Sequence, residues 1–144
     1  MPVRVKLKIK SKLSNTEVET SALVNSGFTT DRPQLIVPRR LAIQLGLWPP
    51  PPESFMVELG TAGGPVRNYL VPNSIEVCIV EPDRSSSTIT CDAIISHIEE
   101  EVLINDMLGE QLGIVLLGLA SGKWRFIDDP PGKVRESYPQ QLWT

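Results

Sequence analysis

Short runs of alternating apolar and polar residues are the feature that most constrains how this chain folds. From Val3 to Lys12 every even-numbered residue is basic, and the residues between them are mostly apolar. A period of two is typical of a β-strand with one buried face. A second strand is predicted from Val18 to Val24, after the turn-forming residues 14–17, and it ends in the apolar run Ala22-Leu23-Val24. The N-terminus is therefore predicted to be a β-hairpin with a basic outer face.

The lysine stripe on this hairpin has two interpretations. The stripe could bind a polyanion. Lysines also solvate the outer face of a strand and discourage pairing at a sheet edge, and this second interpretation is favoured.

The formal net charge of -3 argues against nucleic acid as the main partner, because nucleic-acid-binding proteins normally carry a basic excess. No apolar run approaches the roughly 20 residues that span a bilayer, and the first residues lack the apolar block of a signal peptide. We therefore expect a cytoplasmic protein without a nucleic-acid or membrane partner.

The rest of the chain contains further strand-like runs and two short helices. A helix is predicted from Pro38 to Leu45, because proline is favoured at the first helical position and Gly46 is placed to end the helix. A second helix is predicted after Ile104, with Asp106 as its cap. Strands are predicted at 55–59, 66–71, 75–80, 88–95, 102–104, 115–119 and 123–127.

Two glycine-containing segments mark candidate functional positions. The strand ending at Val24 leads into the sequence Asn25-Ser26-Gly27-Phe28. Later, the segment from Gly60 to Pro65 joins two predicted strands, and its glycines permit a tight hairpin tip. A phosphate-binding loop is the rival interpretation of this second segment, but it lacks the Lys-Ser/Thr pair of that motif.

Four features taken in order resemble the retropepsin-like (retroviral-type) aspartic proteases, especially their single-domain microbial members. They are the Asn25-Ser26-Gly27 turn, the helix ending at Gly46, the glycine-rich hairpin and the segment from Val102 to Trp124. The resemblance implies an all-β fold, a closed barrel with a flap hairpin and one or two short helices, in a domain of residues 1–127. Residues 128–144 have little apolar periodicity and are expected to form an extended C-terminal arm.

The resemblance also assigns roles to individual residues. The catalytic position falls on Asn25, Ser26 and Gly27, and the substrate-binding flap on Gly60, Thr61, Ala62, Gly63 and Gly64. One chain supplies one active-site turn, whereas the family's cleft needs two, so the resemblance implies a homodimer. Its cleft would bind a peptide or protein substrate as an extended strand.

Asn25 changes the chemistry that this family performs. The family carries Asp-Ser-Gly or Asp-Thr-Gly at this turn, and its two carboxylates share one proton during hydrolysis. The carboxamide of Asn25 does not titrate and cannot take a proton from water. Hydrolysis is therefore expected to be absent or very slow, as in a pseudoprotease derived from an aspartic endopeptidase. The alternative is a non-enzymatic dimer that binds peptides or has a structural role.

A second departure from the family pattern lies at Ile104, where the family usually has a glycine behind the active-site turn. Both changes together favour a natural protein that no longer keeps the protease chemistry. Two other candidate catalytic groups are expected to have no catalytic role. Asp31 is expected to be a solvated loop carboxylate, and His97 a surface or strand residue.

The two cysteines and the one histidine are candidate metal ligands, and the two cysteines are also a candidate disulfide pair. Two cysteines and one histidine do not make the usual four-ligand zinc site, so neither a metal nor another cofactor is expected. If the hairpin around residues 81–87 is symmetric about Arg84 and Ser85, Cys78 and Cys91 lie directly opposite each other. Reduced thiols are the expected state in a cytoplasm.

Overall fold

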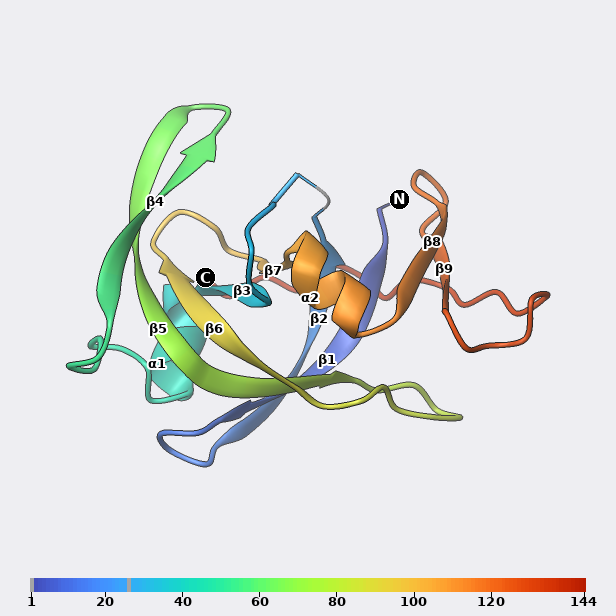
Figure 1. Ribbon diagram of the computed structural model, residues 1–144, viewed down its shortest axis with the longest axis horizontal. Helices are drawn as coiled ribbons and strands as arrows, with labels where there is room; N and C mark the ends of the chain where they lie inside the picture. Colours follow the sequence, from blue (N-terminus) through green and yellow to red (C-terminus); the bar gives the residue numbers. More distant parts are fainter. Residues whose placement is uncertain (1, 26) are drawn as a thin grey trace.

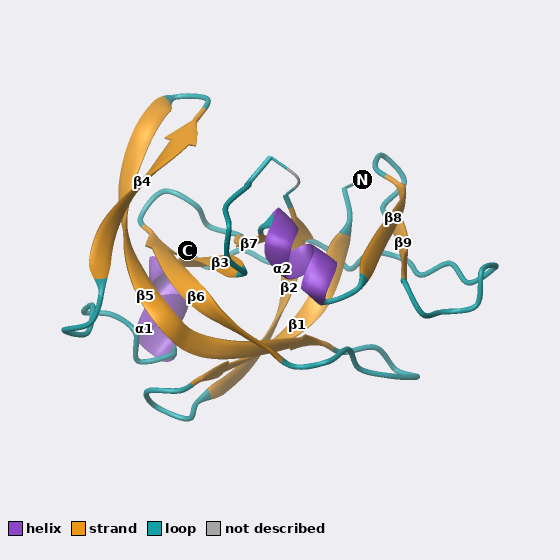
Figure 2. Ribbon diagram, viewed as in Figure 1, coloured by secondary structure: helices purple, strands orange, loops and turns teal. Residues whose placement is uncertain are grey.

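The computed structural model describes residues 2–25 and 27–144 (Figures 1 and 2). Its elements follow in the order β1 (Arg4–Ser11), β2 (Glu17–Val24), β3 (Gln34–Pro38), α1 (Arg39–Gln44), β4 (Phe55–Thr61), β5 (Gly64–Ile79), β6 (Ile89–Ser96), β7 (Val102–Ile104), α2 (Asp106–Gln111), β8 (Ile114–Gly118) and β9 (Lys123–Phe126). Among these helices, none is long and apolar enough to cross a membrane.

Six of the strands close into a barrel. They neighbour one another in the order β1-β2-β7-β3-β6-β5, and a further pairing of β5 with β1 closes the ring. Two pairings are parallel, β2 with β7 and β3 with β6, and the others are antiparallel. The expected all-β closed barrel with two short helices is therefore confirmed.

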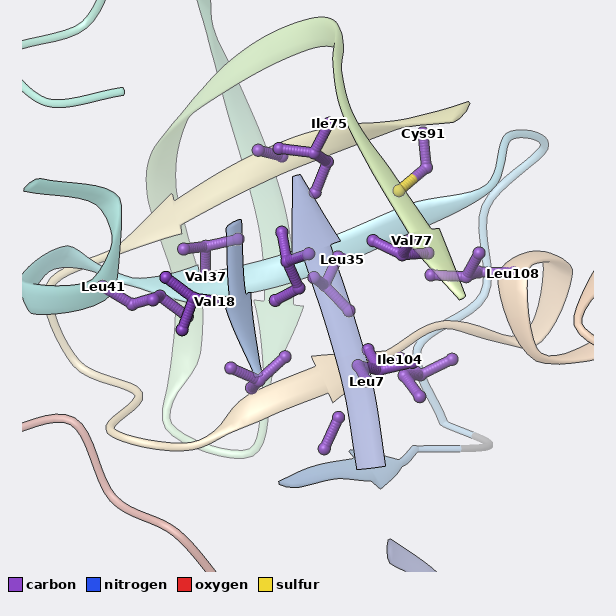
Figure 3. Packing of buried hydrophobic residues seen from close by; sticks show 14 of the residues in the cluster. Leu7, Val18, Leu35, Val37, Leu41, Ile75, Val77, Cys91, Ile104 and Leu108 are labelled. Carbon is purple, nitrogen blue, oxygen red and sulfur yellow. The ribbon is translucent and has the colours of Figure 1, made fainter. Parts of the chain in front are cut away.

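The barrel interior is filled by the alternate apolar residues of its strands. In β1, Leu7 and Ile9 are fully buried, while the alternating Lys6, Lys8 and Lys10 face outward. Figure 3 shows side chains from several strands, among them Leu7, Leu35 and Ile75, gathered in this one interior. On the outer face, Lys10 lies opposite Glu17 and Glu76, so the basic stripe is interleaved with acidic side chains.

Strand β5 is long enough to belong to the barrel and to project beyond it. Its register with β6 shifts between Val71 and Ile75, and Asn73 there has a φ of 47°. After this irregularity β5 pairs with β1, whereas its first half pairs with β4 in a hairpin that rises above the barrel (Figure 1). The register shift bends the strand, as β-bulges do, and separates the hairpin from the barrel wall.

The two helices begin and end close to the predicted residues, with one correction. Helix α1 follows Pro38 and is terminated by Gly46, whose φ of 72° is the left-handed conformation that glycine adopts most readily. The cap of α2 is Asn105 and not Asp106, because the Asn105 side chain accepts a hydrogen bond from the Leu108 N–H. The residue directly before the first helical turn is the one whose side chain can reach back to the free N–H groups of that turn.

The predicted pairing of Cys78 with Cys91 is wrong. Cys91 lies opposite Ile75, and both side chains are buried in the barrel core. The hairpin turn is centred near Asp83, because Val80 bridges Ser85, so the register differs from a turn symmetric about Arg84 and Ser85. Cys78 therefore faces the outer side of β5, opposite Lys8 of β1, and both thiols are free.

The C-terminal arm runs along the barrel as an extended segment. The Tyr138 N–H donates to the Arg4 carbonyl at 3.0 Å, and the Trp143 N–H donates to the Glu100 carbonyl at 2.7 Å. The indole of Trp143 also donates to the Thr20 hydroxyl at 3.0 Å. These contacts hold the arm against β1, β2 and the loop between β6 and β7 of the same chain.

An ionic cluster around Arg135 fastens the beginning of the arm. Its buried guanidinium donates to both oxygens of Asp129 and both oxygens of Asp83. Arg84 adds a second guanidinium that pairs with Asp128. Hydrogen bonds from Arg135 lower the pKa of Asp83 from 3.8 to about 2 and also lower that of Asp129.

We predict an acid-sensitive contribution of this cluster to stability. A carboxyl whose pKa is lowered by folding stabilises the protein above its unfolded pKa of 3.8, and this stabilisation is lost as the pH falls through the folded value of about 2. The variant Arg135→Gln should lower Tm at pH 7 by roughly 5–10 °C, and its difference from the wild type should shrink between pH 4 and 2.

Thermal unfolding followed by circular dichroism at several pH values measures this effect. Lys123→Gln is the matched control, because it removes the same charge from an exposed pair with Glu136 and should change Tm little. A constant difference between Arg135→Gln and the wild type down to pH 2 would contradict the prediction.

Candidate functional site

Asn25 lies at the end of β2, directly beside β7. Its N–H donates to the Ile104 carbonyl at 3.0 Å, and its own carbonyl accepts from the Phe28 N–H at 3.1 Å. These two bonds continue the parallel pairing of β2 with β7 by one residue and then turn the chain sharply. The backbone of Asn25 is thus fixed by the barrel itself, and its half-buried side chain projects from the end of the strand.

The side chain of Asn25 is oriented by the turn that follows it. Its Oδ1 accepts a hydrogen bond from the Gly27 N–H at 3.2 Å. A carboxylate at the same position could accept the same bond, because Asp and Asn have the same shape and both offer an oxygen there. The turn is therefore compatible with either residue. Ser26, the remaining predicted member of this site, lies outside the described residues.

A pocket of about 310 Å³ opens between this turn and the tip of the β4–β5 hairpin. Asn25 and Gly27 line one side, and Gly60, Thr61 and Ala62 line the other. Two segments that were predicted separately from the sequence are thus brought together. In Figure 1 the hairpin and the loop between β2 and β3 rise on the same side of the barrel.

The hairpin tip is tighter than predicted. Its strands continue to Thr61 and Gly64, which pair with each other, so the turn itself contains only Ala62 and Gly63. Gly64 has a φ of 107°, a conformation that side-chain-bearing residues rarely adopt. Gly64 therefore shapes the turn, whereas the three residues Thr61, Ala62 and Gly63 line a second pocket.

This second pocket, of about 430 Å³, continues from the first beneath the hairpin. Both pockets are lined by Ile36, Leu59 and Glu99, so together they form one groove. Phe28, Ile36 and Leu103 form its floor, and they belong to a small apolar cluster on the outer face of the barrel that also contains Leu70 and Ile94. An apolar groove with a few polar groups is a common form of ligand site.

Asn105 anchors the loop that carries the Asn25 turn. Its buried carboxamide accepts from the backbone N–H groups of Gln34 and Leu108, and donates to the Thr30 hydroxyl and the Arg32 carbonyl. One side chain therefore joins β3, α2 and the loop between β2 and β3. The sequence pattern placed the helix cap one residue later, at Asp106, and nothing local indicated the bonds from Asn105 to residues 30–34.

A second anchor lies at the end of the same loop. Asp92 of β6 is fully buried and accepts two hydrogen bonds from Arg32, one from the Gln34 carboxamide and one from the Asn73 N–H. Burial alone would raise the pKa of Asp92, but the hydrogen bonds from Arg32 and Gln34 outweigh it and lower the pKa. The Arg32 to Asp92 pair is therefore ionised and structural.

The other candidate groups are not among the residues that line the Asn25 pocket. Asp31 is exposed and is not part of its lining. Asp106 accepts a hydrogen bond from the Thr29 hydroxyl and lines a different hollow, beside α2. His97 stacks edge to face on Trp48, with 4.9 Å between the ring centres. Of the three, Asp106 is linked to the Asn25 pocket through Thr29, which lines it.

Ile104 packs into the barrel core behind the turn. It is fully buried, lies opposite Val24 and Leu35, and contacts the face of α2 near Gly109. The branched side chain is accommodated by this core, and the Ile104 carbonyl still accepts from Asn25. Ile104 therefore does not break the hydrogen bond that holds the Asn25 turn.

The described residues contain no group of three or more His, Cys, Asp or Glu side chains arranged to hold a metal ion. No family model and no curated protein matches the sequence.

We predict that Asn105 positions the site and stabilises the fold. Asn105→Ala removes the cap and leaves the buried Gln34 N–H without its side-chain acceptor, which should lower the free energy of unfolding by about 3 kcal/mol. Hydrogen exchange in residues 27–33 should also become faster. Urea unfolding and exchange mass spectrometry measure these effects.

Asp106→Asn is the matched control for this prediction. Asp106 is exposed and follows the cap, so its change should cost less than about 1 kcal/mol. Equal destabilisation by Asn105→Ala and Asp106→Asn would mean that Asn105 is not the anchor.

Proposed function

We propose that this protein is a homodimer with a retropepsin-like cleft that binds extended peptides, and that Asn25 leaves it without efficient hydrolysis. The observation that carries the proposal is the pocket between Asn25 and the glycine-containing hairpin tip. The turn, the overhanging hairpin and the apolar floor are the parts that a peptide-binding half-cleft requires.

The groove suits an extended chain. It runs beneath a β-hairpin whose backbone can pair with a peptide strand, which is the usual way of binding an extended segment. Its apolar floor includes Ile36 and Leu103, and its walls include Leu59. Side chains of a bound peptide alternate in direction, so every second one would enter this floor.

The chemistry of the pocket favours binding over catalysis. The Asn25 amide can donate and accept hydrogen bonds but cannot activate a water as a base. Among the described residues that line the pocket, Glu99 is the sole titratable group. The paired carboxylates that drive aspartic proteolysis are therefore missing from this lining.

The proposed dimer interface is the surface formed by β8 and α2. Strand β8 pairs only with β9 in the described part of the chain, and Leu116, Leu117 and Ile127 are exposed beside it. A hollow of about 340 Å³ between β8 and α2 extends to Val24, next to Asn25. An exposed apolar strand edge is a template for pairing with a second copy. A dimer formed through this edge would bring the partner next to Asn25, where it could complete the cleft.

We predict that the protein sediments as a dimer at micromolar concentration. Leu117→Glu should shift it to the monomer by placing a charge in the proposed interface, where Leu117 is 46% exposed. Leu13→Glu is the matched control, because Leu13 is 47% exposed in the β1–β2 turn and outside this surface. A monomeric wild type, or a Leu117→Glu variant that remains dimeric, would argue against the interface.

We predict that Asn25→Asp confers peptide hydrolysis with an acidic pH optimum. In the dimer the change introduces two carboxylates, whose coupled titration gives a bell-shaped rate profile. The rate should exceed that of the wild type by at least about 10²–10⁴-fold, the usual contribution of a general base. Cleavage of a mixed peptide library, followed by mass spectrometry, measures it.

Asn25→Ala controls for general loosening of the site and should remain inactive. A folded, dimeric and inert Asn25→Asp variant would instead favour the non-enzymatic peptide-binding or structural dimer. Hydrolysis by wild-type protein whose intact mass excludes deamidation of Asn25 would overturn the assignment of Asn25 to the catalytic position.

A further inference from the structure

The second pocket of the groove contains a polar side chain without a partner. Asn68 of β5 lines this pocket and is 5% exposed. Its Oδ1 is buried and accepts no hydrogen bond from any described residue. Buried carboxamide oxygens are paired in most proteins, so an unpaired one beside a pocket calls for an explanation.

The surroundings of Asn68 are mostly apolar, and the other polar side chains among them are Thr61, Ser96 and Glu99. Ile36, Leu59, Val66 and Ile98 supply aliphatic walls, and Glu99 supplies a carboxylate. Glu99 is exposed and forms no ion pair within the described part of the chain. Arg39 and Arg40 line an adjacent hollow with Glu99 without pairing with it.

These groups share one chemical character. Asn68 Oδ1 and the Glu99 carboxylate are both hydrogen-bond acceptors, and one of them is negatively charged. Because Oδ1 itself is buried, an occupant reaches it after the Asn68 amide rotates about its soft χ2 torsion, which exchanges the positions of Oδ1 and Nδ2. A fitting occupant therefore has an aliphatic stem for the walls and a cationic donor group at its end. Lysine and arginine side chains have this form.

We infer that this pocket is a specificity subsite for a lysine or arginine side chain of the bound peptide. The inference rests on the proposed peptide-binding function and names the peptide class that the groove selects. The stem of the basic residue packs against Ile36, Leu59 and Val66. Its terminal nitrogen donates to Asn68 Oδ1 and pairs with Glu99.

Peptide binding to the wild-type dimer tests the inference, since that protein is not expected to cleave its ligand. The probes are fluorescein-labelled hexapeptide mixtures with lysine, norleucine or glutamate at one fixed position. Norleucine keeps the aliphatic stem and lacks the charge. At one position, lysine should bind about tenfold more tightly than norleucine, because its hydrogen bonds involve a charged group.

Three variants test whether Asn68 and Glu99 cause the lysine preference. Asn68→Leu and Glu99→Gln should each reduce the lysine preference while leaving the affinity for the norleucine mixture little changed. Asn68→Leu replaces an unpaired amide with an apolar group of similar shape, so the fold should persist, and Tm verifies this. Glu100→Gln is the matched control, because Glu100 is exposed and lines neither pocket of the groove.

The outcomes separate the two proposals. A lysine preference that Asn68→Leu and Glu99→Gln remove and Glu100→Gln retains supports the subsite. If the peptides bind but lysine and norleucine are equal at every position, or the preference survives in both variants, the subsite is overturned and the peptide-binding function stands. If no mixture binds to the dimer, the peptide-binding function fails, and the subsite with it.

Discussion

The parallel pairing of β2 with β7 is the interaction on which the site depends. It sets Val24 opposite Ile104 and brings the next residues of both strands, Asn25 and Asn105, to the same end of the barrel. Because β7 lies between β2 and β3, the loop from 25 to 33 must pass over the end of β7. Asn105 stands at that end and hydrogen-bonds the loop. The same pairing therefore supplies the turn and its anchor.

Local patterns in the sequence were enough to predict the elements that depend on neighbouring residues alone. Alternation identified β1 and β2, and Gly46 marked the end of α1 because that position needs a left-handed conformation. Strand β3 was not predicted, because its five residues are buried on both faces and show no alternation. The register of β5 with β6 was also missed, since it depends on where the connecting turn is centred.

Some residues of the candidate site were predicted from the sequence, and others were found only in the structure. Asn25 and the hairpin tip were predicted from the order of short motifs, and they line one pocket. Asn68 and Glu99 carried no signal, because an isolated asparagine in a strand and a glutamate in an acidic run are ordinary surface residues in sequence. The bend in β5 and the loop after β6 bring them to the same groove. Only the folded structure shows that the two residues line the same pocket.

The central claim is that two Asn25 turns face each other across a twofold axis and complete one peptide-binding cleft. A crystal structure of the wild-type dimer tests this claim most directly. The account predicts the two Asn25 amides within about 3 Å of each other or bridged by one water, below the two hairpin tips. A dimer whose Asn25 turns lie on separate faces, with each groove open to solvent on its own, would contradict it.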